Sequence, residues 1–238
     1  MLEILYQDEY LVAINKPHGL MVHRSKMAGN TDEFALQLLR DQIKQRVHPV
    51  HRLDRKTSGV LLFTLSQELV APIQKQFAAH EVTKTYWAIL RGYAPDSGEI
   101  DYALTNEKGT SQSAITHYKI LARTEIPLPF GKFSTSRYSW VEAKPKTGRM
   151  HQLRKHFAHI NHPIIGDRPH GCNKQNKLFL TQWNMASMLL HARQLELKHP
   201  ITDQPIQLQA TPSEEFKRML AVLSFNRMSD KEQALAGV

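Results

Sequence analysis

Short stretches of alternating or continuous hydrophobic residues recur along this chain of 238 residues, a pattern typical of a strand-rich fold. They predict strands at 2–6, 10–14, 60–65, 84–92, 114–122, 137–143, 189–198 and 206–210, and a shorter one near 100–104. The 60–65 stretch is an almost unbroken apolar run and predicts a buried strand. Residues 93–113 otherwise carry Gly, Asp and Ser, which predicts a loop.

Apolar residues recur at helical spacing in four other stretches. These predict helices from a cap at Asn30 or Thr31 to about Arg46, from Ser66 onward, over 149–161, and from 212–215 onward. Pro72 lies inside the second pattern and should shorten or kink that helix, because proline lacks the backbone N–H.

Strands outnumber helices in this prediction and do not alternate regularly with them, which indicates an α+β fold with a largely antiparallel or mixed sheet. The chain is long enough for one large domain or for two lobes that share a cleft. We find no internal repeat and no low-complexity linker. Residues 1–225 are therefore expected to form one domain of two lobes, and 226–238 a flexible tail.

The net charge of the chain indicates what class of molecule it binds. Lys and Arg number 31 against 22 Asp and Glu, which gives a formal net charge of +9 and an isoelectric point near 9.6. Such a surplus favours a polyanion such as RNA. A membrane surface is disfavoured, because the sequence has no run of 18 apolar residues, no basic amphipathic helix and no signal peptide. Cys172 is the only cysteine, which fits a reducing cytoplasm.

One carboxylate stands out by its neighbours. Asp54 lies among Arg52, Arg55 and Lys56, directly before a Thr-Ser-Gly turn and the predicted buried strand. Nearby cations favour the ionised form of a carboxyl group, so Asp54 is a candidate nucleophile or electrostatic stabiliser. The alternative is an ion pair that ties a loop to the sheet.

Arg154 is a candidate partner for that carboxylate. In the helix predicted over 149–161, the apolar stripe consists of Met150, Leu153, Phe157 and Ile160. Arg154 lies at the edge of the stripe, where it can fold inward and form a bidentate pair with a buried carboxylate. We predict Asp54 as that partner. The alternative is a solvated or RNA-facing cation.

Other chemistries find little support. His151, His156, His159 and His162 have spacings that spread them around a helix, with no Cys or carboxylate among them, so no metal site is predicted. No glycine-rich nucleotide loop and no Gly-x-Ser-x-Gly elbow is present. A glycosidase is not predicted either, because that chemistry needs two catalytic acidic residues and only Asp54 has a motif around it.

Four motifs occur in a characteristic order. They are Asn15-Lys16-Pro17-x-Gly19-Leu20, His51-Arg52-Leu53-Asp54-x-x-Thr57-Ser58-Gly59, Lys84-x-Tyr86 and Lys146-Thr147-Gly148-Arg149-x-His151-Gln152-Leu153-Arg154. In this order the motifs resemble those of the RluA family of pseudouridine synthases, and the resemblance covers about residues 1–212. It implies a long bent mixed sheet of two half-domains with the active-site cleft between them.

The resemblance also implies roles for individual residues. Asp54 is expected to be the catalytic aspartate, Tyr86 to stack on the displaced uracil, and Arg154 to pair with the aspartate. The expected substrate-binding residues are Arg52, which helps displace the base, Leu153, which lines the base pocket, Lys16 beneath the active site, and Arg149 and Gln152. Without the family, Arg52 reads as a salt-bridge or phosphate contact and Tyr86 as an ordinary strand aromatic.

The opening residues and the segment Gly131 to Tyr138 resemble the tRNA-modifying subtype of the family, which acts on uridine 65 of the T stem. We therefore expect a cytoplasmic enzyme that acts on tRNA as a monomer, with no metal, no organic cofactor and no obligatory protein partner. Two alternatives stay open: a ribosomal-RNA synthase of the same family, and an RNA-binding protein that has lost turnover.

Overall fold

A computed structural model describes residues 1–23 and 33–225, which divide into two compact units. Unit 1 comprises Met1–Lys84 and Ala192–Thr211, and unit 2 comprises Thr85–His191 and Pro212–Val238. The predicted helix cap at Asn30 or Thr31 and the predicted tail at 226–238 lie outside the described residues. The strand-rich α+β class predicted from the sequence is confirmed in each unit.

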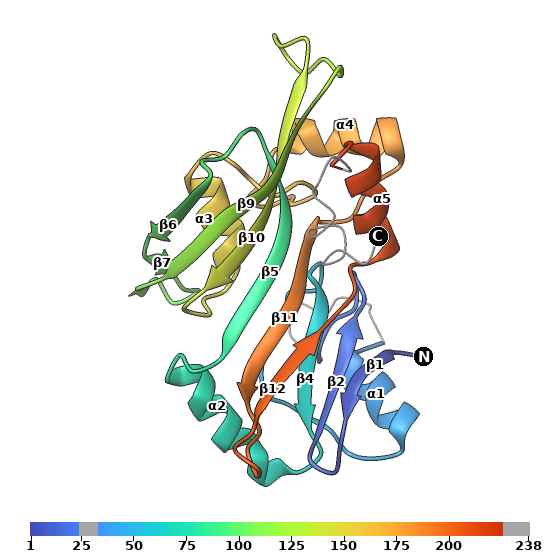
Figure 1. Ribbon diagram of the computed structural model, residues 1–238, viewed down its shortest axis with the longest axis vertical. Helices are drawn as coiled ribbons and strands as arrows, with labels where there is room; N and C mark the ends of the chain where they lie inside the picture. The colour runs from blue at the N-terminus through green and yellow to red at the C-terminus, as the bar shows by residue number, and fades with distance from the viewer. Residues whose placement is uncertain (24–32, 226–238) are drawn as a thin grey trace. The chain divides into compact units, whose positions relative to one another are not determined.

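Unit 1 consists of antiparallel strand pairs and two helices. Its elements are β1 (Glu3–Gln7), β2 (Leu11–Lys16), α1 (Ala35–Ile43), β3 (His48–Pro49), β4 (Ser58–Thr64), the 3₁₀ turn η1 (Gln67–Leu69), α2 (Val70–Ala78), β12 (Pro205–Gln209) and most of β11 (Leu190–Lys198) (Figure 1). Strand β2 pairs with β1 and β4, β3 pairs with β4, and β12 pairs with β11, all antiparallel.

The predicted buried strand is confirmed as β4, whose seven residues are all buried. Its side chains alternate between the two faces of the sheet. Val60 and Leu62 pack in one cluster with Leu11 and Ala13 of β2 and Ile73 of α2. Burial on both faces explains why the sequence shows an apolar run here and not an alternating pattern.

The helices of unit 1 are shorter than the periodicity predicts. Helix α1 ends at Ile43, because Lys44 adopts a left-handed conformation with φ 57°, and does not continue to Arg46. Pro72 shortens the second helix as predicted: residues 67–69 form the 3₁₀ turn, and α2 begins at Val70. Pro72 thus falls in the first turn of α2, where a missing backbone N–H costs no hydrogen bond.

Unit 2 is an antiparallel sheet with three helices. Its elements are most of β5 (Thr83–Arg91), β6 (Ser97–Asp101), β7 (Leu104–Thr105), β8 (Ser111–Gln112), β9 (Ile115–Ile126), β10 (Ser136–Pro145), α3 (Gln152–His159), α4 (Asn173–Trp183) and α5 (Glu214–Val222). Strand β10 pairs with β5 and β9, and β9 pairs with β6. In Figure 1 the yellow-green β9–β10 hairpin projects past the other elements of unit 2.

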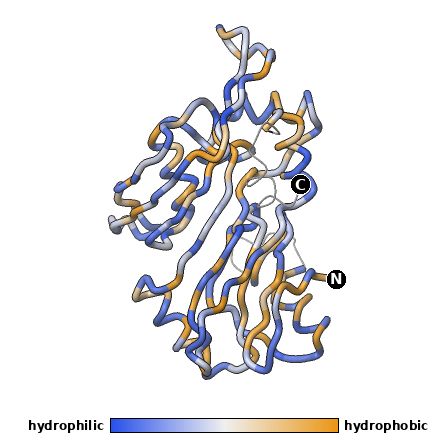
Figure 2. The backbone as a smooth tube through the Cα atoms, viewed as in Figure 1, coloured by the Kyte–Doolittle hydropathy of each residue, from blue (hydrophilic) through white to orange (hydrophobic). Residues whose placement is uncertain are grey.

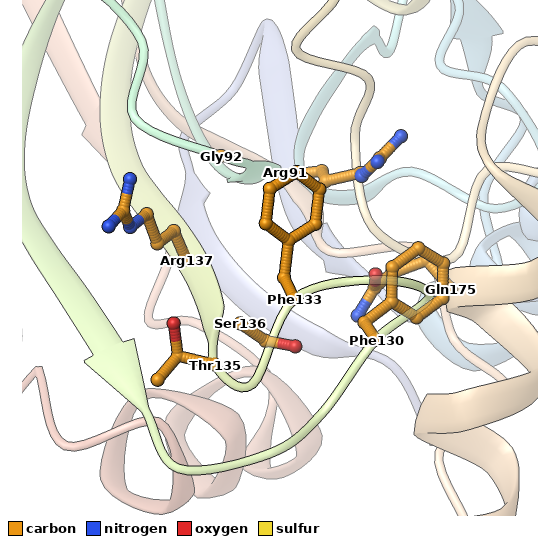
Figure 3. Close-up of a pocket in the computed structure, with 8 residues that line it drawn as sticks. All are labelled: Arg91, Gly92, Phe130, Phe133, Thr135, Ser136, Arg137 and Gln175. Atoms are coloured by element: carbon orange, nitrogen blue, oxygen red, sulfur yellow. The ribbon is translucent and has the colours of Figure 1, made fainter.

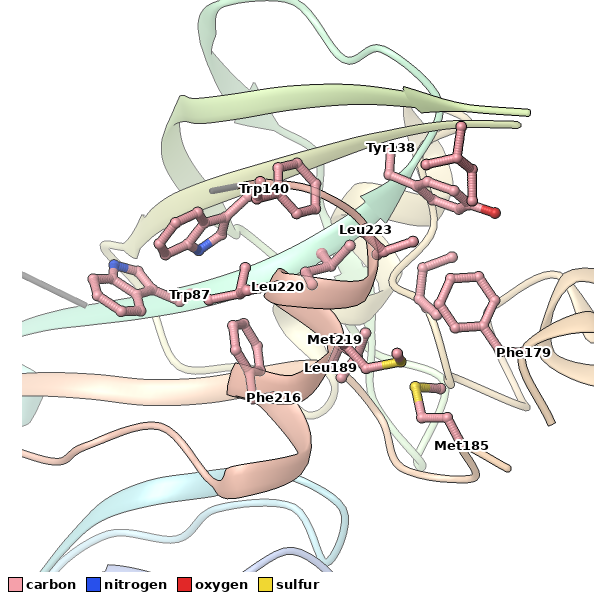
Figure 4. Packing of buried hydrophobic residues seen from close by; sticks show 14 residues of the cluster. Trp87, Tyr138, Trp140, Phe179, Met185, Leu189, Phe216, Met219, Leu220 and Leu223 are labelled. Atoms are coloured by element: carbon pink, nitrogen blue, oxygen red, sulfur yellow. The ribbon is translucent and has the colours of Figure 1, made fainter. Parts of the chain in front are cut away.

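An aromatic-rich cluster forms the main core of unit 2. Trp87 of β5 and Trp140 of β10 meet edge to face, with ring centroids 5.0 Å apart (Figure 4). Helix α5 contributes Phe216, Met219 and Leu220 to the same cluster, and each of them is at most 4% exposed. The Ser213 hydroxyl caps α5 by accepting a hydrogen bond from the Phe216 backbone N–H, so the predicted start of this helix is confirmed.

Helix α4 is absent from the sequence prediction. Its residue before the first turn, Cys172, offers no side-chain cap, and the five positions 173–177 are all polar. Only Gln175 and Phe179 are buried, so the helix has no apolar stripe to detect. The short strand placed near 100–104 was also wrong by three residues, since β6 spans Ser97–Asp101.

Hydrophobic residues concentrate in the strands of both units, and several turns at strand ends are hydrophilic (Figure 2). Among the described residues, no helix is both long enough and apolar enough to cross a bilayer.

Candidate active site

The loop that carries Asp54 leads directly into β4 of unit 1. The Thr57 backbone N–H donates to the Asp54 carbonyl at 3.0 Å, which closes a turn. Gly59, two residues further on, has φ +110°, and a Cβ there would lie 2.2 Å from the Ala192 carbonyl oxygen. The Thr-Ser-Gly sequence therefore ends in glycine because β11 passes too close for any side chain.

The buried side chain of Lys16 holds this loop in place through hydrogen bonds to backbone carbonyls. Its side chain is fully buried, and its Nζ donates to the carbonyls of Pro17 at 2.9 Å, Leu20 at 2.8 Å and Arg55 at 3.2 Å. Three donors match three acceptors, as an ammonium group requires. Burial lowers the pKa of Lys16 to about 7, while the charge of the Asp54 carboxylate opposes that shift. Lys16 thus forms a structural support that also places a buried amine near Asp54.

Arg55 also connects the Asp54 loop to the turn Lys16–Leu20. Its carbonyl accepts from the Gly19 backbone N–H at 2.9 Å, and its Nε donates to the Gly19 carbonyl at 3.0 Å. The Lys16–Leu20 turn and the Asp54 loop are therefore joined by hydrogen bonds to both the backbone and the side chain of one residue. Arg52, in contrast, is exposed.

His51 has a structural contact that the sequence did not indicate. Its Nε2 accepts a hydrogen bond from the Leu62 backbone N–H at 3.0 Å, and its ring stacks on Phe77 with centroids 5.2 Å apart. Burial, together with the smaller effect of the Lys84 charge, lowers the pKa of His51 to about 4. His51 is therefore neutral at pH 7 and anchors the start of the loop to β4.

In unit 2, Arg154 of α3 forms a buried bidentate ion pair with Asp167. The Nε and Nη2 atoms each lie 2.8 Å from one carboxylate oxygen, and the side chains are only 7% and 1% exposed. The inward orientation predicted for Arg154 is thus confirmed. The carboxylate that accepts it within unit 2 is Asp167, which the sequence analysis did not name as a partner. The predicted pair with Asp54 stays a prediction.

Asp167 is fixed by the tight loop around it. Gly166 has φ +83°, and its backbone N–H donates to the Asn176 side chain at 2.9 Å. Asn176 in turn donates to the Asp167 carbonyl at 2.7 Å. A Cβ on Gly171 would lie 2.0 Å from that carbonyl oxygen, so the loop can close only around glycine.

The amide of Gln152 is used completely inside unit 2. Its Oε1 accepts from the Thr147 hydroxyl at 2.7 Å and from the Arg149 backbone N–H at 3.0 Å. Its Nε2 donates to the Ile115 carbonyl and to the Thr116 hydroxyl, both at 3.0 Å. All four hydrogen-bonding positions are therefore occupied within unit 2, which indicates that Gln152 fixes the turn before α3. Its predicted contact with substrate stays a prediction.

Sequence and structure comparisons agree on one family. The model for RNA pseudouridylate synthase matches residues 10–159. The chain belongs to the RNA pseudouridylate synthase family. It is 50% identical over 221 residues to the tRNA pseudouridine synthase C of Vibrio vulnificus (strain CMCP6), covering 88% of this chain and 90% of that one. The Vibrio cholerae protein of the same name is 47% identical over 232 residues, covering 93% and 95%.

Solved structures agree on the pseudouridylate synthase fold. The human protein RNA Pseudouridylate Synthase Domain Containing 4 matches with a TM-score of 0.71 and 27% identity, and the match covers 93% of each chain. The fold expected from the motifs is therefore confirmed.

Within this family member, the predicted site residues fall into two groups. Asp54, Arg52 and Lys16 belong to unit 1, and Tyr86, Leu153, Arg154, Arg149 and Gln152 belong to unit 2. In unit 2, Tyr86 and Leu153 pack in one hydrophobic cluster, in which Leu153 is 6% exposed and Tyr86 is partly buried. Arg149 donates from Nε to the Ser113 carbonyl at 3.0 Å.

The histidines of the downstream motif form hydrogen bonds, not a metal cluster. His151 and His170 are joined through Nδ1 and Nε2 at 2.9 Å, and His156 bonds the Thr116 hydroxyl and the Tyr102 carbonyl, each at 3.0 Å. Across residues 1–23 and 33–225, no group of His, Cys, Asp and Glu is arranged to hold a metal ion.

Proposed function

We propose that this chain isomerises a uridine of tRNA to pseudouridine. The observation that carries the proposal is the identity of 47–50% to proteins named tRNA pseudouridine synthase C, which extends over about nine-tenths of both chains. The formal charge of +9 suits a polyanionic substrate.

Asp54 is the proposed nucleophile. Its carboxylate adds to carbon 6 of the uracil or to the anomeric carbon of the ribose, and the N1–C1′ bond breaks. The base turns, a C5–C1′ bond forms, carbon 5 loses its proton, N1 gains one, and Asp54 is released. Uridine and pseudouridine are isomers, so the reaction needs no redox partner and no energy source. The loop geometry supports this role, since Lys16, His51 and Arg55 hold the Asp54 segment in one conformation.

Arg154 is the proposed cationic partner of Asp54. A guanidinium carries five N–H donors, and the pair with Asp167 uses two of them. Arg154 can therefore serve a second carboxylate while Asp167 fixes its orientation. Asp167 is in this proposal a positioning residue.

Two hydrophobic residues of unit 2 are proposed to receive the uracil. Tyr86 offers a ring for stacking on the base and a hydroxyl near carbon 5, and Leu153 lines the pocket wall. Exposed Arg52 is proposed to help displace the base from its stack. Lys16 and Gln152 act through the loops they hold, and Arg149 contacts the RNA beside them.

The proposed target is uridine 65 of the T stem, modified in the cytoplasm by a monomer without metal or organic cofactor. The test is to map pseudouridines in the RNA of cells that lack the protein and of cells that carry it again. We expect one site in tRNA to disappear and to return. Loss of a site in ribosomal RNA alone would contradict the choice of tRNA, and no lost site would contradict the activity.

A further inference from the structure

The tip of the β9–β10 hairpin carries two phenylalanines on a short turn. Phe130 and Phe133 pair across it, with backbone N–H to carbonyl distances of 3.0 Å and 3.2 Å in the two directions. Gly131 stands at the first central position with φ +61°, the position where a type II′ turn favours glycine. The turn therefore places the two rings on one side of the hairpin.

A hollow of about 180 Å³ lies beside these rings, entirely within unit 2. It is lined by Arg91, Gly92, Phe130, Phe133, Thr135, Ser136, Arg137 and Gln175. In Figure 3 the Phe133 ring stands between the side chains of Arg91 and Arg137, and Phe130 lies beside Gln175 of α4. None of the lining residues belongs to the set proposed for catalysis.

The aromatic surface at this hollow is accessible. Phe133 is 58% exposed. The Lys132 ammonium lies 5.6 Å from the Phe133 ring centroid, and the Arg91 guanidinium lies 5.4 Å from the Phe130 centroid. Cations beside exposed rings are the combination that binds nucleotides, with the ring for the base and the cation for the phosphate.

The charge of Arg91 is uncompensated inside the described part of the chain. The Arg91 guanidinium forms no ion pair and no hydrogen bond with the described residues. The Arg137 guanidinium, in contrast, forms an ion pair with Glu125, with Nε 3.1 Å from the carboxylate oxygen. The segment from Pro127 to Thr135 contains one lysine and no acidic residue. An anionic ligand would therefore meet net positive charge at the hollow.

The floor of the hollow offers a polar contact. Gln175 is only 2% exposed, and its Nε2 donates to the Tyr138 hydroxyl at 2.5 Å. Its Oε1 receives no hydrogen bond from the described residues. A carbonyl oxygen in this place can accept an N–H from the edge of a base.

We propose that this hollow binds one unstacked nucleotide of the RNA substrate, outside the uridine that is isomerised. The base stacks on Phe133, its edge meets Gln175, and its phosphate pairs with Arg91. The inference rests on the proposed function for the identity of the substrate, because it assumes that the occupant is part of the same RNA.

The first test compares substitutions at Phe133 in the full-length protein, with dissociation constants for tRNA measured by fluorescence anisotropy. Stacking contributes about 1–3 kcal/mol per base, so Phe133→Ala should weaken binding about tenfold. The single-turnover rate at saturating protein should stay unchanged. Phe133→Trp should bind within about twofold of wild type. Phe133→Leu should be as weak as Phe133→Ala, because leucine keeps apolar bulk but has no π face.

Leu180→Ala is the matched control, since Leu180 is also an exposed apolar residue at 44% and lies on α4. It should bind as wild type does. Wild-type affinity in Phe133→Leu or in Phe133→Ala would overturn the proposal, because the ring would then only pack the hairpin.

The second test identifies the occupant with tRNAs that carry a single abasic site at each unpaired position in turn. At one position the abasic change should weaken binding to the wild type about tenfold and have no further effect on Phe133→Ala. Additive effects at every position would overturn the proposal.

The cation can be tested separately by salt dependence. Arg91→Gln should lower the magnitude of the slope of log affinity against log salt concentration by about one. Arg40→Gln is the control and should leave the slope unchanged, because Arg40 already pairs with Asp41 in unit 1. An unchanged slope in Arg91→Gln would argue against a phosphate at this place.

These tests are separate from the proposed function. If the wild type releases no tritium from carbon-5-labelled tRNA, the proposed activity fails. If it does release tritium while Phe133→Ala binds tRNA as tightly as wild type, only the nucleotide hollow fails.

Discussion

Each unit buries one cation next to a proposed functional loop, but the two cations are stabilised in different ways. Lys16 of unit 1 is surrounded by three backbone carbonyls and forms no ion pair with the described residues. Arg154 of unit 2 is paired with the buried carboxylate of Asp167 through two hydrogen bonds of 2.8 Å.

The difference determines how each site responds to pH. Carbonyl groups offset only part of the desolvation of a buried ammonium, so the pKa of Lys16 falls to about 7. A guanidinium bound to a carboxylate stays charged at any pH at which the protein folds. The Asp54 segment is therefore held by a support that titrates near neutrality, and α3 by one that does not.

The largest expected effect comes from removing one partner of the buried pair. Asp167→Ala leaves the Arg154 charge buried without that carboxylate and should cost about 3–5 kcal/mol of the free energy of unfolding. Urea denaturation measures this loss. Activity should fall as well, because Arg154 loses the residue that orients it.

Two controls separate stability from function. The double substitution Arg154→Leu with Asp167→Leu should restore most of the stability, since apolar side chains replace both charges, but it should stay inactive. Glu215→Ala removes a partner of the exposed Arg218 on α5 and should cost less than about 1 kcal/mol. A loss below about 1 kcal/mol in Asp167→Ala would show that the pair is not important for the fold.

A smaller effect is expected for Lys16. Between pH 7 and 10.5 the unfolded chain binds a proton at Lys16 that the folded protein does not bind, so the free energy of unfolding rises with pH in this window. From pH 7 to pH 9 the contribution is about 2 kcal/mol. Lys16→Met should lose this rise, as measured by urea denaturation at several pH values.

Lys198→Met is the matched control, because Lys198 of β11 is 63% exposed and should keep the wild-type pH dependence. The Asp167→Ala variant should also keep the wild-type pH dependence, because the Arg154 guanidinium does not titrate between pH 7 and pH 9. An unchanged rise in Lys16→Met would contradict the contrast between the two cations.

The longer strands and all four predicted helices could be found from the sequence, because burial on one or both faces leaves a periodic pattern. The two-residue strands β3, β7 and β8 are too short to leave one. Helix α4 could not, since it buries only Gln175 and Phe179 and begins without a side-chain cap. Helix α3 was predicted three residues too early, because Met150 fits the apolar spacing yet is 37% exposed. The left-handed conformation of His151, with φ 57°, instead delays the start of α3 to Gln152.

For the site, the motifs predict which residues take part but not the contacts that these residues make. Arg154 was predicted to fold inward, which its position beside the apolar stripe indicates. Its partner Asp167 lies 13 residues away and reaches it only through the glycine-dependent loop, a geometry that spacing does not encode. The hollow at Phe133 could not be predicted from the sequence, because its walls come from β5, the β9–β10 hairpin and α4, which are far apart along the chain.

The central claim is that the Asp54 carboxylate carries the chemistry. The most direct measurement is tritium release from carbon-5-labelled tRNA by the wild type and by Asp54→Asn, which keeps the size of the side chain but removes its charge. We predict stoichiometric release by the wild type and none above background by Asp54→Asn, with tRNA affinity retained. Release by Asp54→Asn at the wild-type rate would contradict the account.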